Sequence, residues 1–347
     1  MGNIYHDHLD ELRGIELKNQ PVISLFIPLK WNDYSAGRVF TALMKAADTL
    51  CAKGGHPKPQ IKTPEWDRWL QQGTTTLALY YHAGLTRLIP LPSRMQPRVV
   101  VAKSFHLKPL VTASQEYVDA LLLHFNESGA SLFRINASGE TLVDRYLPSE
   151  VLPKSDWPAR LDRQSLREFL EFLLQEVRAS ILPTTKLLGV TGSTYTELQV
   201  ESFWKKAKLP LIFSPDSFRS AVPQNSFSIV RLRLAQMVNE RHTESVMRVL
   251  KDVRNSDVDL PIQLLVPKIL NREIKQLCVS LDCMLFGEIN PLTGDVVVNR
   301  SQVNAADDDL LDDLVELALE KKIDVSVVPK KFLPKGRSFV ASLREGL

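Results

Sequence analysis

The sequence predicts an α/β protein with more than one domain. Its 347 residues exceed what one hydrophobic core usually organises, because single cores stop growing at roughly 250–300 residues. Apolar segments with strand character alternate with segments of helical period, which is the order typical of α/β domains. Hydrophobic residues make up 44% and charged residues 24% of the chain, so a largely disordered protein is excluded.

The first third predicts a compact α/β unit that ends near residue 113. The run VISLFIPL at 22–29 is short, apolar and β-branched, and it predicts a buried strand. Apolar residues from Phe40 to Cys51 recur every three to four positions and predict a helix over about 37–52. A turn-rich segment with three prolines lies between the last two predicted strands. The remaining elements are a short helix ending near 72 and strands at 74–82 and 98–102.

The middle third predicts a hairpin followed by strand, helix and strand. The turn residues Asn136 and Gly139 separate the two strands of the hairpin. A strand, a helix and a second strand in this order predict parallel pairing through a right-handed crossover. The predicted elements are strands at 130–135 and 140–143, a helix at 165–181, a strand at 186–191, a helix at 194–207 and a strand at 209–213.

The last third alternates helices with strands again, which predicts another α/β unit. A long helix leads into it, and the sequence Asn-Pro-Leu-Thr-Gly at 290–294 predicts a turn. The predicted elements are helices at 227–253, 270–279 and 310–321 and strands at 261–266, 283–286 and 323–328.

Charge is distributed unevenly, although the net charge is only +3. No Asp or Glu occurs between Arg68 and Gln115, whereas the stretch from Asp307 to Glu316 holds six acidic residues and no basic one. This asymmetry predicts an electropositive N-terminal unit able to meet phosphate and a distal unit that would repel it. Two alternatives stay open: the cations are scattered over a solvated sheet, and the acidic residues complement a helix dipole.

Enzyme signatures are absent from the sequence. There is no P-loop and no G-x-G-x-x-G, G-x-S-x-G or H-E-x-x-H motif. His6 and His8 are two residues apart, so on a helix their side chains point in different directions and would not share a metal. Cys278 and Cys283 lack the second pair that a zinc site needs. We therefore predict no catalytic residues, no metal and no cofactor.

The sequence also favours a cytoplasmic protein. No stretch approaches the ~20 apolar residues of a membrane span, and the polar N-terminal residues lack the apolar core of a signal peptide. Three cysteines, with Cys51 far from the other two, are too few for a disulfide framework.

Four segments resemble the archaeo-eukaryotic peptide-chain release factors, in the order in which that family has them. PVISLFIP at 21–28 resembles the family's opening strand, and AKSFHLKP at 102–109 resembles the K-F-H segment that closes its first domain. LFGEINPLTGDV at 285–296 is similar to an L-W-G-x-x-D-P-x-T-G-x-V stretch of the family's bacterial branch, and FVASLR at 339–344 to its tail. That branch includes the hibernation factor Balon, with Pelota as a more distant relative.

The resemblance implies three consecutive α/β domains of release-factor or Pelota-like architecture. On this basis we expect a basic N-terminal domain over 1–114 that contacts rRNA in the decoding centre, a middle domain over 115–216, and a C-terminal domain over 217–347 that contacts other factors. The implied partners are the ribosome and a translational GTPase; neither DNA nor a membrane is expected. The RNA-facing candidates are Arg38, Arg68, Arg87, Arg94, Arg98, Lys103, His106 and Lys108.

Two family motifs are missing. The middle domain contains no Gly-Gly-Gln, the loop that positions water on peptidyl-tRNA in true release factors, and the stop-codon-reading Asn-Ile-Lys-Ser sequence is absent. The sequence therefore predicts a ribosome-associated factor of bacterial origin that acts in hibernation or rescue without peptide release. The alternatives are a hydrolase of peptidyl-tRNA or RNA that uses His106 or His124, and a protein-binding adaptor that uses the acidic segment.

Overall fold

The computed structural model describes residues 4–17, 21–31, 34–71, 74–126, 129–136, 139–147, 163–192, 211–212, 223–252, 260–299 and 308–344. These residues form two compact units. The middle unit contains Tyr117–Val238, and the other, here called the terminal unit, combines Asn3–Glu116 with Asn239–Leu347. Both contain helices and sheets, so the predicted α/β class is confirmed. The division into three domains at residues 114 and 216 stays a prediction.

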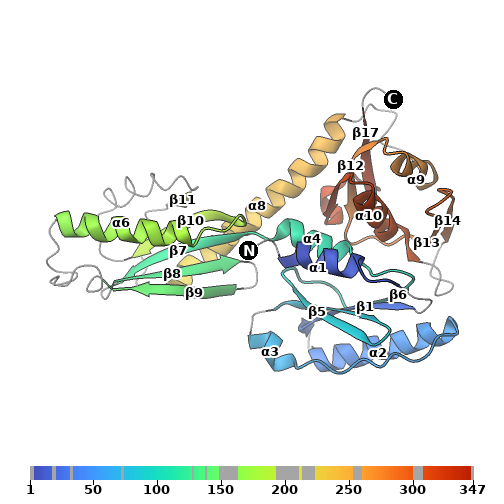
Figure 1. Cartoon of the computed structure of the whole chain (residues 1–347), viewed down its shortest axis with the longest axis horizontal. Coiled ribbons are helices and arrows are strands. Elements are labelled where there is room, and N and C mark those ends of the chain that lie inside the picture. Colours follow the sequence, from blue (N-terminus) through green and yellow to red (C-terminus); the bar gives the residue numbers. More distant parts are fainter. Residues whose placement is uncertain are drawn as a thin grey trace. The chain divides into compact units, whose positions relative to one another are not determined.

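The N-terminal part of the terminal unit is built on an antiparallel sheet of order β5-β4-β1-β6. Every residue of the central strand β1 is buried, as its uninterrupted apolar run predicts. Helix α2 covers one face through Phe40, Leu43 and Ala47, while α1 and α4 lie on the other side in Figure 1. The bounds are α1 Ile4–Arg13, β1 Val22–Pro28, β2 Lys30–Trp31, β3 Tyr34–Ser35, α2 Ala36–Lys53, α3 Trp66–Gln71, β4 Thr76–His82, β5 Leu85–Leu91, β6 Arg98–Ala102 and α4 Lys108–Glu116.

Strand β5 lies where the sequence predicted a turn-rich segment. Pro90 sits opposite Leu77 within the β4–β5 pair. A proline interrupts a central strand because it has no N–H to donate, but β5 is the edge of the sheet, where one side of the backbone needs no partner. Because Pro90 was taken as a turn residue, the sequence analysis did not predict this edge strand.

The C-terminal part of the terminal unit has two small sheets, of order β16-β12-β17 and β14-β13-β15. Strand β12 runs parallel to β16 and antiparallel to β17. The bounds are α8 Pro223–Asp252, α9 Ile262–Leu270, β12 Ile274–Ser280, β13 Phe286–Ile289, β14 Val296–Asn299, β15 Asp308–Asp309, α10 Leu310–Glu320, β16 Asp324–Val328, a 3₁₀ turn Lys330–Phe332 and β17 Phe339–Leu343.

Two adjacent elements in this part were predicted wrongly. The segment expected to be a strand at 261–266 is helix α9, and the expected helix at 270–279 contains strand β12. The buried residues of α9 are Ile262, Leu265, Val266 and Ile269, which is the i, i+3, i+4, i+7 spacing of a helix face. Its high apolar content made the segment look like a buried strand, although the helical period was present.

Helix α4 joins the two parts of the terminal unit. The side-chain amide of Gln115 donates to the carbonyl of Val325 at 2.7 Å and accepts from the N–H of Val327 at 3.0 Å. Strand β16 is the edge of its sheet, so Gln115 satisfies backbone groups that would otherwise lack a partner. A helix from the first third of the chain therefore protects a sheet edge of the last third.

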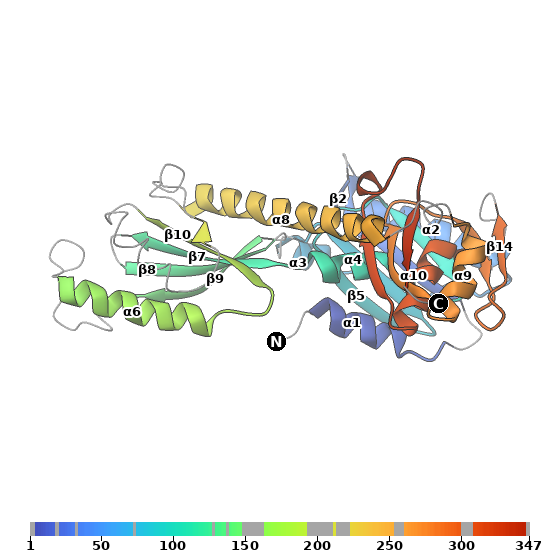
Figure 2. The same ribbon diagram turned by 90° about the horizontal axis from the view of Figure 1, so that it is seen from above.

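The middle unit is built on a mixed sheet of order β11-β10-β7-β8-β9, and described helices pack on both of its faces. Helix α6 packs on the face that carries Leu121 and Leu123, and the first half of α8 packs on the face that carries Ala120 and Leu122; both helices are visible in Figure 2. The predicted parallel pairing of β10 with β11 is confirmed. The bounds are β7 Asp119–Asn126, β8 Gly129–Asn136, β9 Gly139–Tyr146, α6 Arg163–Ala179, β10 Thr185–Gly192 and β11 Leu211–Ile212.

The predicted helix at 194–207 lies outside the described residues, as does Asp307 of the acidic stretch. Strand β7, which the sequence analysis did not predict, is the central strand of this sheet. In the described part of the chain, no helix combines the length and apolarity that crossing a membrane requires.

Gly287 in β13 provides a direct test of packing in the β13–β14 hairpin. A Cβ atom at this position would lie 2.0 Å from the carbonyl oxygen of Val297 and 2.8 Å from a methyl group of Leu310. We expect Gly287→Ala to lower the free energy of unfolding by about 1–3 kcal/mol, because the backbone of β14 must move. Gly37→Ala is the control, since its Cβ would lie 3.5 Å from Trp66, an ordinary contact, and alanine favours a helix. Urea denaturation measures the free energy of unfolding of both variants. Equal values for Gly287→Ala and Gly37→Ala would contradict this expectation.

Candidate functional site

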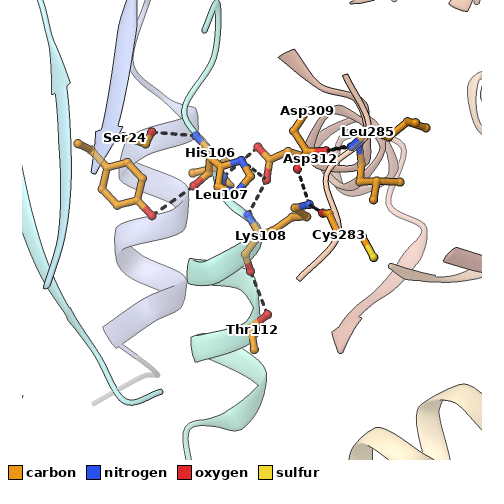
Figure 3. A network of polar contacts seen from close by, with 11 residues as sticks. Ser24, His106, Leu107, Lys108, Thr112, Cys283, Leu285, Asp309 and Asp312 are labelled. Carbon is orange, nitrogen blue, oxygen red and sulfur yellow. Dashed lines mark hydrogen bonds and ion pairs between the residues drawn. The ribbon is translucent and has the colours of Figure 1, made fainter. Parts of the chain in front are cut away.

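The segment between β6 and α4 brings the first and last thirds of the chain together. His106 and Lys108 point into a buried group of polar side chains that also contains Asp309 and Asp312 of the α10 region (Figure 3). We call these four residues the Lys108 cluster. Lys108 Nζ forms an ion pair with Asp309 and donates to the carbonyl of Cys283 at 2.8 Å.

The two carboxylates of the Lys108 cluster cap two helices. Asp309 is the N-cap of α10 and accepts from the N–H groups of Leu311 at 3.2 Å and Leu285 at 3.0 Å. Asp312 accepts from the N–H groups of Leu107 at 3.0 Å and Lys108 at 2.7 Å, where α4 begins. Helix N-termini present unpaired N–H donors and partial positive charge, so each carboxylate is stabilised where it lies.

Burial shifts the proton affinities of the cluster in opposite directions. It lowers the pKa of His106 well below the usual value, and the nearby cations Lys108 and Arg98 lower it further. It raises the pKa of Asp312, an effect to which the carboxylate of Glu316 adds and which Lys108 opposes. His106 Nδ1 lies 3.5 Å from a carboxylate oxygen of Asp312. The lowered pKa therefore keeps the His106 imidazole uncharged at neutral pH, beside the Lys108–Asp309 ion pair.

The prediction that His106 and Lys108 face RNA is wrong. Their exposed fractions are 1% and 0%, and Lys108 is already neutralised by Asp309. The sequence showed only that these two residues alternate with Phe105 and Leu107. This spacing fits both an exposed pair that contacts RNA and a pair that is buried in the protein. Burying a lysine requires a carboxylate partner, and that partner lies about 200 residues away in the sequence.

The other six RNA-facing candidates differ in how much of their charge is available. Arg87 pairs with Glu11, and Lys103 pairs with Glu288, each at 2.5 Å between side chains that are partly exposed. Arg98 is half-buried, with one guanidinium nitrogen fully covered. Arg38, Arg68 and Arg94 are exposed, as is Lys103 despite its ion pair. Their role in RNA binding stays a prediction.

Helix α2 presents two cations that the sequence analysis missed. Its exposed residues are Arg38, Thr41, Ala42, Lys45, Thr49, Ala52 and Lys53, none of which is acidic. At 100° per residue these seven positions fall within an arc of about 120°. A count of cations at helical period from residue 38 would have found Lys45 and Lys53, whereas the search for acid-free stretches began only at residue 68.

The cysteines and the remaining histidines form no second candidate site. Burial raises the pKa of Cys278 to about 12, so this thiol stays protonated. Burial also acts to raise the pKa of Cys283, but hydrogen bonds with Ser280 and Ser338 lower it overall. His124 is 3% exposed, and burial lowers its pKa. Among the residues that the structure describes, no group of three or more His, Cys, Asp or Glu is placed to hold a metal.

No protein-family model matches the chain, and no curated protein matches it. Among solved structures, the chain is similar to an archaeal translation termination factor, aRF1, with 14% identity, coverage of 99% of this chain and 98% of that one, and a TM-score of 0.25. It is similar to ribosome-bound archaeal Pelota, with 11% identity, coverage of 99% and 94%, and a TM-score of 0.40. It is also similar to Dom34 of S. cerevisiae, a translation termination-like factor, with 9% identity, coverage of 99% and 93%, and a TM-score of 0.43. The placement in the family's bacterial branch stays a prediction.

Removal of one partner from the buried ion pair should destabilise the terminal unit strongly. We expect Lys108→Met to lower the free energy of unfolding by roughly 3–5 kcal/mol, because Asp309 is left buried and charged. Adding Asp309→Asn should recover part of this loss. Lys103→Met is the matched control: it removes a lysine from an exposed pair and should cost less than about 1 kcal/mol. Equal losses in the two lysine variants would show that burial of the pair is unimportant.

His106 should make stability depend on pH. Its pKa is lower in the folded than in the unfolded chain, so its contribution is complete above about 6.5 and is lost as the pH falls, by up to about 1.4 kcal/mol per pH unit. Asp312 acts in the opposite sense, because its folded pKa is raised. The comparison with His106→Leu isolates the histidine: the variant should gain stability relative to the wild type between pH 7 and pH 5. A constant difference across this range would mean that the pKa of His106 is the same in the folded and the unfolded chain.

Proposed function

We propose that this chain is a ribosome-associated translation factor that acts in ribosome rescue or hibernation and does not release peptide. The observation that carries the proposal is the exposed face of α2, which has three cations, no acidic residue and otherwise only small side chains. A phosphate-rich RNA surface is the partner that such a face suits.

The geometry of α2 favours contact with a polyanionic backbone. Arg38, Lys45 and Lys53 are spaced seven and eight residues apart, which corresponds to about 10 and 12 Å along the axis. The hydroxyls of Thr41 and Thr49 bond to carbonyls of the preceding turn, at 2.9 Å each, so these side chains lie against the helix. Nothing bulky therefore prevents phosphates from approaching the cations.

Helix α3, which packs against the N-terminal part of α2, carries a further exposed cation. The ring of Trp66 lies 5.5 Å from that of Phe40, and Trp66 also contacts the position of Gly37. Arg68, two residues further along α3, is exposed, and its guanidinium carbon lies 5.5 Å from the centre of the Trp69 ring. Contacts of this kind are independent of RNA sequence and sensitive to salt.

The resemblance to release factors supports the translation part of the proposal. The segments that carry it in the first and last thirds include β1, the segment of the Lys108 cluster, the β13–β14 hairpin and β17. Through the contacts of Asp309 and Lys108, the segment at 102–109 is joined to the loop that leads into the hairpin at 285–296. The family-like segments are thus parts of one packed unit. By the same resemblance, we propose a translational GTPase as the partner of the C-terminal third.

Absence of the Gly-Gly-Gln sequence supports a role without peptide release. The competing hydrolase hypothesis relied on His106 or His124. Both side chains are buried, so neither can reach a substrate in this conformation. Burial also lowers the pKa of both imidazoles and so favours their neutral form. No described feature favours hydrolysis over binding.

The α2 face can be tested by sedimentation with purified ribosomes. We expect the wild-type protein to sediment with ribosomes at low salt and the variant Arg38→Glu, Lys45→Glu, Lys53→Glu to stay largely in the supernatant. Because each phosphate contact contributes about 0.7–0.9 to the slope of log K against log salt, the variant's slope should be about 2–3 smaller in magnitude.

The matched control changes the same number of exposed cations elsewhere in the terminal unit. Lys251, Lys322 and Lys335 are exposed and do not lie on α2. Their replacement by glutamate gives nearly the same net charge but should leave binding close to that of the wild type. If both triple variants lost ribosome binding equally, the binding would depend on net charge alone and not on the α2 face. Failure of the folded wild-type protein to sediment with ribosomes would refute the proposal.

A further inference from the structure

Within the described residues, the chain passes between the two units at two places. The first crossing joins Glu116, the last residue of α4, to Tyr117. The second crossing lies inside α8, between Val238 and Asn239. Strand β7 begins at Asp119, so only two residues separate it from α4. Both crossings are therefore short, and the second is part of one continuous helix.

The side chains of Glu116 and His242 are in contact beside both crossings. A carboxylate oxygen of Glu116 lies 2.9 Å from Nε2 of His242, about one helical turn beyond Val238 in α8. The other oxygen accepts a hydrogen bond from the hydroxyl of Ser93, in the connection between β5 and β6. The ring of Phe332 lies 5.1 Å from the imidazole of His242. One carboxylate therefore joins α4, α8 and the β5–β6 connection.

The position of Glu116 is unfavourable for α4 itself. The C-terminus of a helix carries partial negative charge, so a carboxylate there lowers helix stability. The last turn of α4 contains no basic residue that would offset this effect. The side chains of Glu116 and His242 are only 12% and 7% exposed, and a buried carboxylate needs hydrogen-bond partners. The contact with α8, and not the stability of α4, therefore accounts for this residue.

Helix α8 has a separate packing surface in each unit. Its first half packs on the middle sheet through Phe227 and Val230. Its second half packs in the terminal unit through Val246 and Val249. His242 lies between these two sets of residues along the helix. A contact at His242 therefore holds α8 where the helix enters the terminal unit.

We infer that the Glu116–His242 contact, here called the clasp, restrains the movement of the middle unit by holding the two crossings together. With the clasp formed, the end of α4 and the adjoining turn of α8 are fixed to each other. With the clasp broken, the link formed by Tyr117 and Val118 and the adjoining turn of α8 gain freedom, as short connections between packed elements do at a hinge. This inference does not depend on ribosome binding.

Hydrogen exchange followed by mass spectrometry tests the local part of the inference. The double variant Glu116→Gln, His242→Leu removes the contact with little change in side-chain volume. We expect amide exchange about tenfold faster than in the wild type at 117–119 and at 239–243, because a buried hydrogen bond to a charged group is lost. The matched control, Lys268→Gln with Glu273→Gln, removes a partly exposed ion pair at the end of α9 and should leave exchange at both crossings unchanged.

Single-molecule FRET tests whether the clasp restrains the middle unit. The dyes are attached at the exposed positions of α2 and α6 through Ala42→Cys and Gln175→Cys. Cys283→Ser removes the half-buried native thiol, and the other two native cysteines are buried. We expect a broader distribution of transfer efficiency in the double variant than in the wild type, and no broadening in the control.

Two results would overturn the inference. Equal exchange in the double variant and the wild type would show that other contacts hold the crossings. Faster exchange with an unchanged width of the FRET distribution would show that the contact stabilises only its surroundings. If circular dichroism shows that the double variant is unfolded, Glu116→Gln alone replaces it, with a smaller change expected in the same direction. None of these results bears on ribosome sedimentation, so failure here is separable from failure of the proposed function.

Discussion

The terminal unit depends on one requirement: the buried ammonium of Lys108 must have a carboxylate beside it. A buried lysine is strongly destabilising unless it is paired and hydrogen-bonded. Lys108 meets this condition through its ion pair with Asp309 and its hydrogen bond to the carbonyl of Cys283. The cation comes from a stretch that has no acidic residue, and the anion comes from a stretch that has no basic residue. The two ends of the chain must therefore meet for either charge to be buried.

Several other contacts follow from this meeting. Asp312 can cap α4 only when α10 lies beside the segment at 107–108, and Gln115 can satisfy the edge of β16 only when α4 is held there. A cavity beside α10 exists for the same reason, since its walls come from both ends of the chain. Separation of the two parts would expose Lys108, Asp309 and the β16 edge together. We therefore expect the N- and C-terminal thirds to unfold as one cooperative unit.

The charge asymmetry of the sequence has a different meaning in the folded chain. Much of it is neutralised internally, through Lys108 with Asp309 and Lys103 with Glu288. On the described surface of the terminal unit, the exposed face of α2 carries three cations and no acidic residue.

The sequence by itself determined the elements whose own periodicity is strong, namely β1, α2, α6, α8 and α10, and with them the α/β class. It did not determine β5, whose proline is tolerated only at an edge, or β7, or the order of α9 and β12, where an apolar segment fits both a helix and a strand. It identified Arg38 and Arg68 as cations and the segment at 103–108 as notable, but not which of these side chains are exposed. Only the tertiary structure decided that His106 and Lys108 are buried and that Lys45 and Lys53 share a face with Arg38. The physical reason is that exposure and pairing depend on partners remote in sequence, whereas helical and strand periods depend on neighbours within a few residues.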